Sequence, residues 1–207
     1  MVKLGGSSAA APGLRGWLDA SAQGAGATVL VPGGGLFADG VRAAQAAMGF
    51  DDSAAHRLAL AAMRQYGLAL CALHPALAGT ATLRAIAGAL KARRVPVWLP
   101  EAMALADASI PASWEVTSDS LAIWLGVKLQ ARAVILIKQI RPAPASAAVL
   151  AASGVVDRAF PAFLARAAIP VFIAGPGDIE ALGAALRSGH MVGLNPVLPD
   201  PSPGTSQ

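Results

Sequence analysis

A lysine and a pair of glycines near the N-terminus form the first group of residues suited to phosphate chemistry. Lys3 lies in a short apolar run that Gly5, Gly6 and Ser7 follow. Glycines let backbone amides approach phosphate oxygens closely, and the N-terminus of a following helix adds a favourable dipole. A lysine beside such a turn neutralises charge on a phosphoryl group in transfer. The same residues also suit an ordinary strand-to-helix turn, and the Gly-Lys-Ser order of the Walker motif is absent.

A second glycine-rich turn follows the next β-rich run. Gly33, Gly34 and Gly35 come after the run 28–31 and before an apolar-periodic segment. Tight packing of a strand against a helix accounts for part of this glycine content, but three successive glycines are more permissive than packing needs. The carboxyl ends of neighbouring parallel strands meet at one edge of a sheet, so two such turns place two sets of anion-binding amides together.

Three further side chains each suit two roles, one structural and one functional. Asp119, within Thr-Ser-Asp-Ser, either caps a helix, which is the default role of such a string, or holds catalytic lysines in place. Arg42 and Arg57 suit bidentate binding of a phosphate, although each also suits a solvated helix face. The 16 basic residues are dispersed along the whole chain, and aromatic residues make up 5% of it, so the sequence indicates no nucleic-acid surface.

The elements that position these residues alternate between short β-rich runs and longer helical patterns, which is typical of βαβ units. The predicted strands are 1–4, 28–31, 95–99, 133–138 and 170–173. The predicted helices are 14–22, 36–48, one capped within 51–53, a neighbouring one from Thr80 or Thr82 to Leu90, one from 118–120 to about Gln130, one capped by Asp157 and reaching Ala168, and one capped by Asp178 and ending at Gly189. We expect the two mid-chain helices to lie side by side. The fold class is α/β, a three-layer αβα sandwich with a mainly parallel central sheet.

Composition sets the limits of this interpretation. The 207 residues, 55% hydrophobic and 14% charged, suit one domain over 1–195, followed by a disordered Pro, Ser and Gly-rich tail at 196–207. Apolar runs are too short to span a membrane, and the start lacks the pattern of a signal peptide. Cys71 is the only cysteine, which suits a reducing compartment, so we expect a cytoplasmic protein. The net charge of +4 favours anionic small molecules as partners.

Taken together, Lys3-x-Gly5-Gly6-Ser7, Pro32-Gly-Gly-Gly35 and Thr117-Ser118-Asp119-Ser120-Leu121 resemble, in order and approximate spacing, the motifs of the amino acid kinase superfamily, which includes acetylglutamate kinase, aspartokinase and uridylate kinase. The finer resemblance is to the aminomethylfuran phosphate kinase branch. It is carried by His56-Arg57-Leu-Ala, Leu99-Pro100, Trp114-x-Val-Thr-Ser-Asp-Ser-Leu121 and Val156-Asp157-x-x-Phe160-Pro161. It covers residues 1 to about 187.

The resemblance implies transfer of the ATP γ-phosphoryl group to a phosphate monoester, most specifically to aminomethylfuran phosphate in the synthesis of a methanofuran-type cofactor. Lys3 and Lys138 then flank the phosphoryl group, and Asp119 positions both lysines. Gly5, Gly6 and Ser7 contact the nucleotide phosphates. The residues implied on the acceptor side are Gly33, Gly34, Gly35, Arg42, His56, Arg57, Thr117 and Ser118. ATP, Mg²⁺ without dedicated protein ligands, and a homo-oligomer are also implied.

The chain departs from the family after the late strand. Many members have Thr-Asp-Val-Asp-Gly there, whereas this chain has Lys138-Gln-Ile-Arg-Pro142. In relatives this segment lies near the base and ribose of the nucleotide. The choice of donor therefore stays open. So do two other hypotheses, a nucleoside monophosphate or carboxylate kinase of the same superfamily and a nucleotide-binding member without catalysis.

Overall fold

The computed structural model describes residues 1–191 and 193–198, and within them one seven-stranded sheet lies between helices. The strands are β1 (Val2–Leu4), β2 (Leu30–Pro32), β3 (Leu77–Thr80), β4 (Val95–Trp98), β5 (Val134–Ile137), β6 (Val171–Ala174) and β7 (Asn195–Pro196). The helices are the 3₁₀ helix η1 (Gly6–Ala10) and α1 (Leu14–Ala22), α2 (Gly35–Met48), α3 (Asp52–Leu73), α4 (Leu83–Lys91), α5 (Glu101–Leu105), α6 (Ser118–Lys128), α7 (Ala147–Ala152), α8 (Phe160–Ala165) and α9 (Ile179–Ser188).

The strand order is β3-β4-β2-β1-β5-β6-β7, and β1 lies at the centre. Lys3 pairs with Val31 of β2 on one side and with Leu136 of β5 on the other, both in parallel. Strands that are buried on both faces of a parallel sheet read as continuous apolar runs, as β5 does. Only β7 pairs antiparallel within the described part of the chain, against β6. The carboxyl ends of β1, β2 and β5 therefore share one edge.

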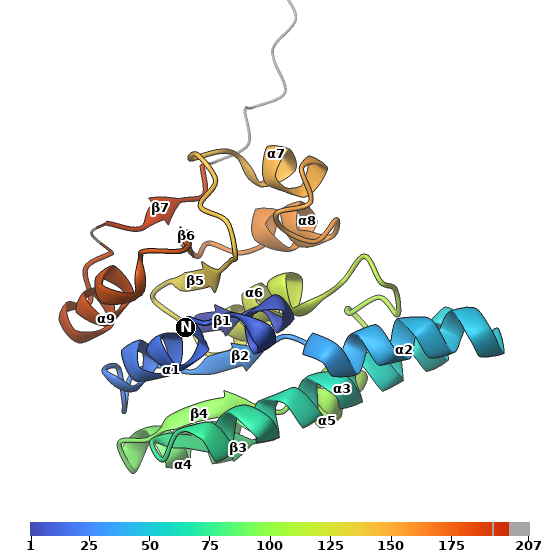
Figure 1. Cartoon of the computed structure of the whole chain (residues 1–207), viewed down its shortest axis with the longest axis horizontal. Helices are drawn as coiled ribbons and strands as arrows, with labels where there is room; N and C mark the ends of the chain where they lie inside the picture. The colour runs from blue at the N-terminus through green and yellow to red at the C-terminus, as the bar shows by residue number, and fades with distance from the viewer. Residues whose placement is uncertain (192, 199–207) are drawn as a thin grey trace, which may run out of the picture.

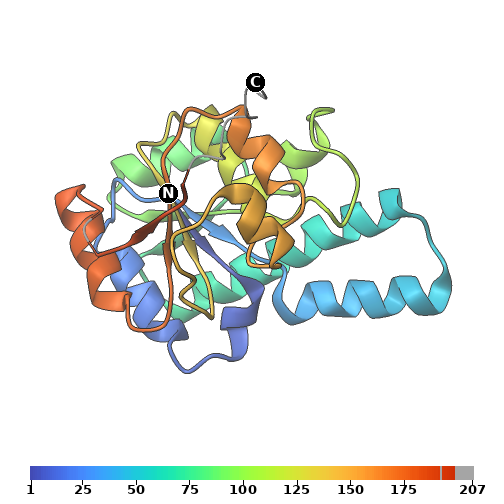
Figure 2. The ribbon, with the colours of Figure 1, turned by 90° about the horizontal axis from the view of Figure 1, so that it is seen from above.

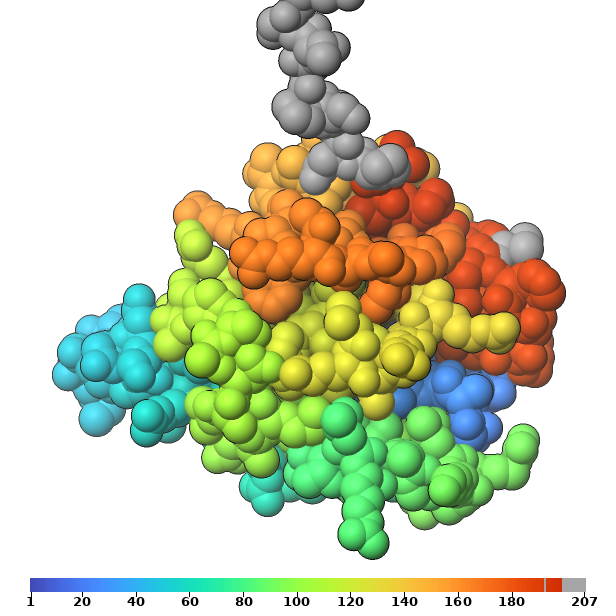
Figure 3. Space-filling view, turned by 180° about the vertical axis from the view of Figure 1, so that it is seen from behind, coloured from blue at the N-terminus to red at the C-terminus, as the bar shows by residue number. Residues whose placement is uncertain are grey.

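Alternation of side chains along the strands divides the core into two layers. Val2 and Leu4 of β1 belong to a cluster with α1, α3 and α9. Val134 and Leu136 of β5 belong to a second cluster with α4, α6 and α8. Figure 1 shows α1, α3 and α9 in front of the sheet, and Figure 3 shows α4, α6 and α8 on the back. The predicted αβα sandwich with a mainly parallel sheet is confirmed.

Helices α2 and α3 form an antiparallel pair that projects from the carboxyl edge of the sheet (Figure 2). Gly49 ends α2 in the left-handed conformation, with φ 74°, which glycine adopts at no steric cost. Asp51 then caps α3, because its Oδ1 accepts a hydrogen bond of 2.8 Å from the amide of Ala54. The pair brings the N-terminus of α2 directly over the first glycine turn.

Several predicted elements are corrected. Strand β3 is absent from the predicted set. It pairs beyond β4 at the edge of the sheet, so the chain reverses direction along the sheet between α3 and α4, and the two helices lie on opposite faces rather than side by side (Figures 1 and 3). Its Ala-Gly centre has low β propensity, and β3 depends on pairing with β4. Asp157 does not cap the next helix, since α8 begins at Phe160 with Ala159 as its N-cap.

The predicted boundary of the C-terminal tail is also wrong for its first residues. Pro196 pairs with Phe172 in the sheet, and the amide of Leu198 donates to the carbonyl of Ala145 at 2.9 Å. The rest of the predicted tail, residues 199–207, lies outside the described residues. No helix among the described residues has both the length and the apolarity to cross a membrane.

Candidate active site

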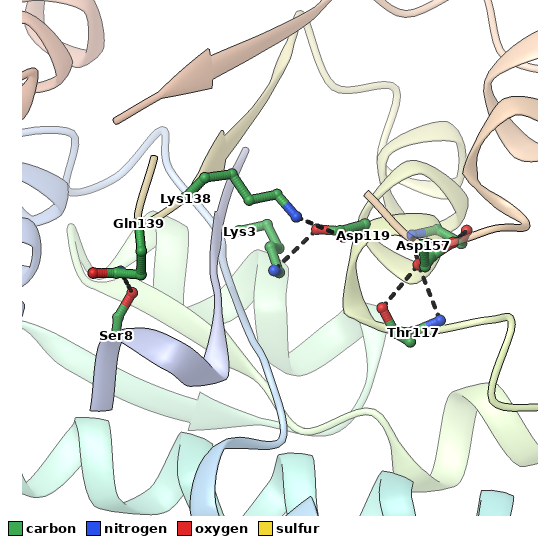
Figure 4. Close-up of polar contacts among 8 residues, drawn as sticks. Lys3, Ser8, Thr117, Asp119, Lys138, Gln139 and Asp157 are labelled. Carbon is green, nitrogen blue, oxygen red and sulfur yellow. Dashed lines mark hydrogen bonds and ion pairs between the residues drawn. The ribbon is translucent and has the colours of Figure 1, made fainter. Parts of the chain in front are cut away.

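Two lysines and one aspartate converge at the carboxyl edge of the sheet (Figure 4). Lys3 is on β1, Lys138 directly follows β5, and Asp119 lies in the first turn of α6. The Nζ of Lys3 is 2.9 Å from Oδ1 of Asp119, and the Nζ of Lys138 donates to Oδ2 at 2.7 Å. We call these three residues the lysine–aspartate cluster. Asp119 therefore does not cap α6 but bridges two ammonium groups.

Burial makes the electrostatics of this cluster strong. Side chains of Lys3 and Asp119 are each 6% exposed, and that of Lys138 is 13% exposed. Burial alone would raise the pKa of Asp119, but the charges of Lys3 and Lys138 outweigh it, so that its pKa is lowered. Burial and the charge of Lys3 lower the pKa of Lys138 to about 8, against the attraction of Asp119. One carboxylate thus holds two positive charges in a site of low polarity.

The two glycine turns touch each other backbone to backbone beside the cluster. A Cβ placed on Gly6 would collide with the backbone of Gly35, and one placed on Gly33 would collide with the amide of Gly6. Gly35 also has a φ of 56°, in the left-handed region. A Cβ on Gly5 would lie 3.1 Å from the Nζ of Lys3. Close approach of the turns therefore requires glycine, and it brings the amides at the start of α2 to the cluster.

A cavity of about 300 Å³ opens between these turns and the α2–α3 pair. Lys3 and the first turn of α6 border its inner end, and apolar side chains of α3, including Leu60 and Met63, form one wall. The residues that line it and were predicted from the sequence are Lys3, Gly6, Ser7, Gly34, Gly35, Arg42, His56, Thr117 and Ser118. The cavity is therefore the place where most of the predicted residues meet.

The remaining predicted residues lie elsewhere. Gly5 and Gly33 take part in the packing of the two turns but do not line the cavity. Lys138 reaches the site through Asp119. Arg57 is exposed and borders a separate depression between α3 and the segment 104–112. Of the two arginines considered as phosphate clamps, only Arg42 faces the cavity.

Trp114 lines the cavity, and it was absent from the predicted site residues. The guanidinium carbon of Arg42 lies 4.3 Å from the centre of its ring, and its indole Nε1 donates to Oε1 of Gln45 at 2.7 Å. A cation over an aromatic face is held electrostatically. The signal in the sequence was the position of Trp114 at the start of the Trp-x-Val-Thr-Ser-Asp-Ser-Leu string. The segment before α6 is thereby fastened to α2.

His56 is buried in the cavity wall, and burial lowers its pKa, which favours a neutral imidazole. Residues 1–191 and 193–198 contain no group of three or more His, Cys, Asp or Glu side chains placed to hold a metal ion. The carboxylate of Asp119 is already engaged by two lysines.

Comparison with known proteins defines the class of this site. A family model described as the amino acid kinase family matches residues 1–141. The chain belongs to the amino acid kinase family, as its motifs predicted.

One curated relative and two solved structures are similar to this chain. The chain is 30% identical over 138 residues to (5-(aminomethyl)furan-3-yl)methyl phosphate kinase of Methanocaldococcus jannaschii, which covers 66% of this chain and 63% of that relative. The crystal structure of uridylate kinase from Archaeoglobus fulgidus superposes with a TM-score of 0.66 at 18% identity, covering 90% of this chain and 95% of that one. The UMP kinase from Bacillus anthracis does so with 0.65 at 13% identity, covering 97% and 95%. At these identities the two structures support the fold alone.

Proposed function

We propose that this chain is an ATP-dependent kinase that transfers the γ-phosphoryl group to a phosphate monoester. The observation that carries the proposal is the lysine–aspartate cluster, in which one buried carboxylate holds two ammonium groups beside two glycine turns and a cavity. Catalysis of phosphoryl transfer consists mostly of positioning and charge stabilisation. A preorganised pair of cations supplies both.

In this proposal each group of the site has a separate role in phosphoryl transfer. Lys3 and Lys138 neutralise the oxygens of the phosphoryl group in transfer, and Asp119 keeps both ammonium groups in position. Backbone amides of Gly6 and Ser7 donate hydrogen bonds to the phosphates of ATP, and those at the start of α2 donate to the phosphate of the acceptor. ATP would contribute the phosphoryl group, and Mg²⁺ would neutralise its β and γ oxygens.

The acceptor that we propose is aminomethylfuran phosphate. The cavity combines a cation, Arg42, with an aromatic wall at Trp114 and apolar side chains such as Met63. Its volume of about 300 Å³ is at the lower end of the range of ligand sites, roughly 300–1,000 Å³, which favours a small ring that carries one phosphate. The aminomethylfuran phosphate kinase relative supports the same choice.

A panel of acceptors tests this proposal. The purified chain is incubated with ATP and Mg²⁺ and with aminomethylfuran phosphate, UMP or acetylglutamate, and formation of ADP and of the phosphorylated product is followed. We expect the diphosphate of aminomethylfuran as the main product. Preference for UMP would reject the proposed acceptor, and tight binding of ATP without transfer to any acceptor would support a non-catalytic member.

A lysine pair tests the mechanism. Lys3→Ala is expected to lower turnover about 10²- to 10³-fold, because it removes one of the two preorganised cations. Lys91→Ala, at the exposed end of α4, is the matched control and should leave turnover unchanged. Equal turnover of the wild type and Lys3→Ala would remove the cluster from the mechanism.

We also propose that the chain forms a homo-oligomer. Apolar side chains are exposed on α2, where Leu36 is 71% and Met48 76% exposed, and surfaces of this kind are common at subunit contacts. Light scattering after size-exclusion chromatography should give a mass at least twice that of the 20.7 kDa chain. A monomer at micromolar concentration would contradict this.

A further inference from the structure

The carboxylate of Asp157 is placed to organise the lysine–aspartate cluster without touching substrate. It lies between α7 and α8, far along the chain from α6, yet its hydrogen bonds all go to the first turn of α6. Oδ2 accepts from the amide of Thr117 at 3.0 Å, from its hydroxyl at 2.9 Å and from the amide of Ser120 at 3.0 Å. The hydroxyl of Ser120 donates to Oδ1.

These bonds replace the usual cap of α6. Thr117 occupies the N-cap position but makes no side-chain bond to the helix, since its hydroxyl donates to Asp157. The amide of Ser120, which an N-cap side chain usually satisfies, is bound by Asp157 instead. A negative charge at a helix N-terminus is also favourable for the helix dipole. Asp157 therefore caps α6 from another segment of the chain.

The position of Asp119 makes this cap relevant to catalysis. Asp119 lies between Thr117 and Ser120, so both ends of the short segment that carries it are bound to one carboxylate (Figure 4). Residues Ser118–Gly126 of α6 are all buried, and the amide of Ala159 donates to the carbonyl of Glu115, which ties the two segments together a second time. The turn has little freedom to move independently of Asp157.

We propose that Asp157 is a positioning residue for phosphoryl transfer, which fixes the first turn of α6 and thereby holds Asp119 between Lys3 and Lys138. The inference rests on the proposed function for its catalytic part only, because the placement of Asp119 is a property of the protein without substrate. A cap that only stabilised α6 would act on Lys138 through its own charge alone, whereas a positioning residue also acts on it through Asp119, so a change that keeps the charge of Asp157 but breaks one of its bonds distinguishes the two roles.

That electrostatic effect is measurable at Lys138. The charged groups that face its ammonium are Lys3, Asp119 and Asp157. Burial and Lys3 lower the pKa of Lys138 to about 8, whereas Asp119 and, to a smaller extent, Asp157 act in the opposite direction. Asp157→Asn removes one negative charge and loosens Asp119, so the pKa of Lys138 should fall below 8.

Asp107 provides a matched control at the other end of the same helix. Its carboxylate also accepts from several donors, including Trp124 and Lys128 of α6 and the hydroxyl of Ser109. Asp107→Asn removes a charge and loosens α6 as Asp157→Asn does, but away from the lysine–aspartate cluster. The two variants therefore separate a structural role from a positioning role.

The primary experiment is NMR of protein labelled with ¹³C-lysine, in which the four lysines of the sequence are titrated and Lys138 is assigned through Lys138→Arg. We expect Asp157→Asn to lower the Lys138 titration midpoint and Asp107→Asn to leave it in place. With an active acceptor, Asp157→Asn should lower kcat about tenfold and change KM little. Tenfold is the lower end of the loss of activity found when a group that orients a metal-binding side chain is removed.

The outcomes distinguish this inference from the proposed function. A Lys138 midpoint that is lowered in Asp157→Asn and, by a smaller amount, in Ser120→Ala, which keeps the charge of Asp157 and removes one of its bonds, supports the positioning role. If the wild type phosphorylates no acceptor, the same result also rejects the kinase activity. An unchanged midpoint in a folded Asp157→Asn, or an equal change in Asp107→Asn, overturns the positioning role. If Asp157→Asn does not fold, Ser120→Ala, which removes one donor to Asp157, should still shift the midpoint in the same direction by a smaller amount, and no shift there overturns it.

Discussion

The two sides of the lysine–aspartate cluster are built on different principles. On the β2 side, two glycine turns and the α2–α3 pair leave a cavity into which Lys3, Arg42 and the start of α2 face. On the β6 side, the polar side chains bind the protein itself. Arg141 pairs with Asp178 at 3.0 Å and also donates to the carbonyl of Gly193 at 3.1 Å.

Other polar groups on the β6 side are used in the same way. Gln139 donates to the hydroxyl of Ser8 at 2.8 Å (Figure 4). Asn195 donates to the carbonyl of Pro142 at 2.8 Å. Segment 138–142 is where the sequence departs from the family pattern. In this chain, contacts of the segment hold β5, η1 and β7 together. We expect changes on the β2 side to affect turnover and changes on the β6 side to affect stability.

The largest expected contrast is between two glycines that both touch backbone. A Cβ at Gly6 would collide with the backbone of Gly35, whereas one at Gly175 would lie 2.7 Å from Cβ and 2.8 Å from Cα of Arg141. Gly6→Ala and Gly175→Ala should each destabilise the fold by about 1–3 kcal/mol, as overpacking does. Only Gly6→Ala should lower kcat, by about 100-fold, since it displaces the phosphate turn.

Thermal unfolding and steady-state kinetics check this pair, with Gly40→Ala as a reference, because Gly40 has no atom within 4 Å of its added Cβ. Gly40→Ala should be stabilising by up to about 1 kcal/mol. A loss of turnover in Gly175→Ala as large as in Gly6→Ala would mean that the β6 side belongs to the active site after all.

Much of the fold was predictable because local patterns agree with the tertiary structure. Strand β5 is β-branched and buried on both faces, and α3 has an Asp cap that functions as predicted. Strand β3 was not predictable, because Ala78 and Gly79 form a strand only through pairing with β4 and through Arg94, which donates to the carbonyls of residues 75–77.

The local motifs of the site were predictable, but the contacts between residues from distant segments were not. Glycine turns are local features, and the sequence places them correctly beside each other. The role of Asp119 stayed open between a cap and a lysine partner, because it depends on residues that come from three separate segments. Asp157 was assigned to its own helix for the same reason. Sequence rules describe capping by a residue next to the helix. Here the cap of α6 comes from Asp157, which is 40 residues from Thr117 in the sequence.

The two arginines of the α2–α3 pair sharpen the definition of the cavity. Arg42→Ala should raise KM for the phosphorylated acceptor about tenfold, because it removes a charge-assisted contact of about 1.5 kcal/mol. Arg57→Ala should change KM less than about twofold, since Arg57 borders a different depression. Initial-rate measurements over a range of acceptor concentrations check both variants. An equal rise in KM would show that the acceptor extends beyond the cavity.

The pH dependence of turnover reports on Lys138, which joins the two sides. The pKa of about 8 for Lys138 in the free protein means that the protonated form needed for phosphoryl transfer predominates below pH 8, so kcat/KM should decline above that pH. The free energy of unfolding should instead rise as the pH increases. Between pH 8 and the ordinary value of 10.5, the unfolded chain holds a proton that the folded Lys138 has lost, so unfolding becomes less favourable as pH rises. A Lys138→Arg variant should lose the decline in kcat/KM near pH 8, and persistence of the decline in this variant would assign it to another group.

The smallest expected effect tests whether the β6 side is purely structural. Gln139→Ala removes the hydrogen bond to Ser8, whose side chain is buried within η1, so it should destabilise the fold by about 1 kcal/mol. Because Gln139 neither lines the cavity nor touches the cluster, kcat should stay within about threefold of the wild type. Chemical denaturation and kinetics at saturating ATP measure the two quantities. Unchanged stability with a marked rise in KM for ATP would instead assign Gln139 to the nucleotide site, and the segment that replaces the acidic motif would then have a binding role of its own.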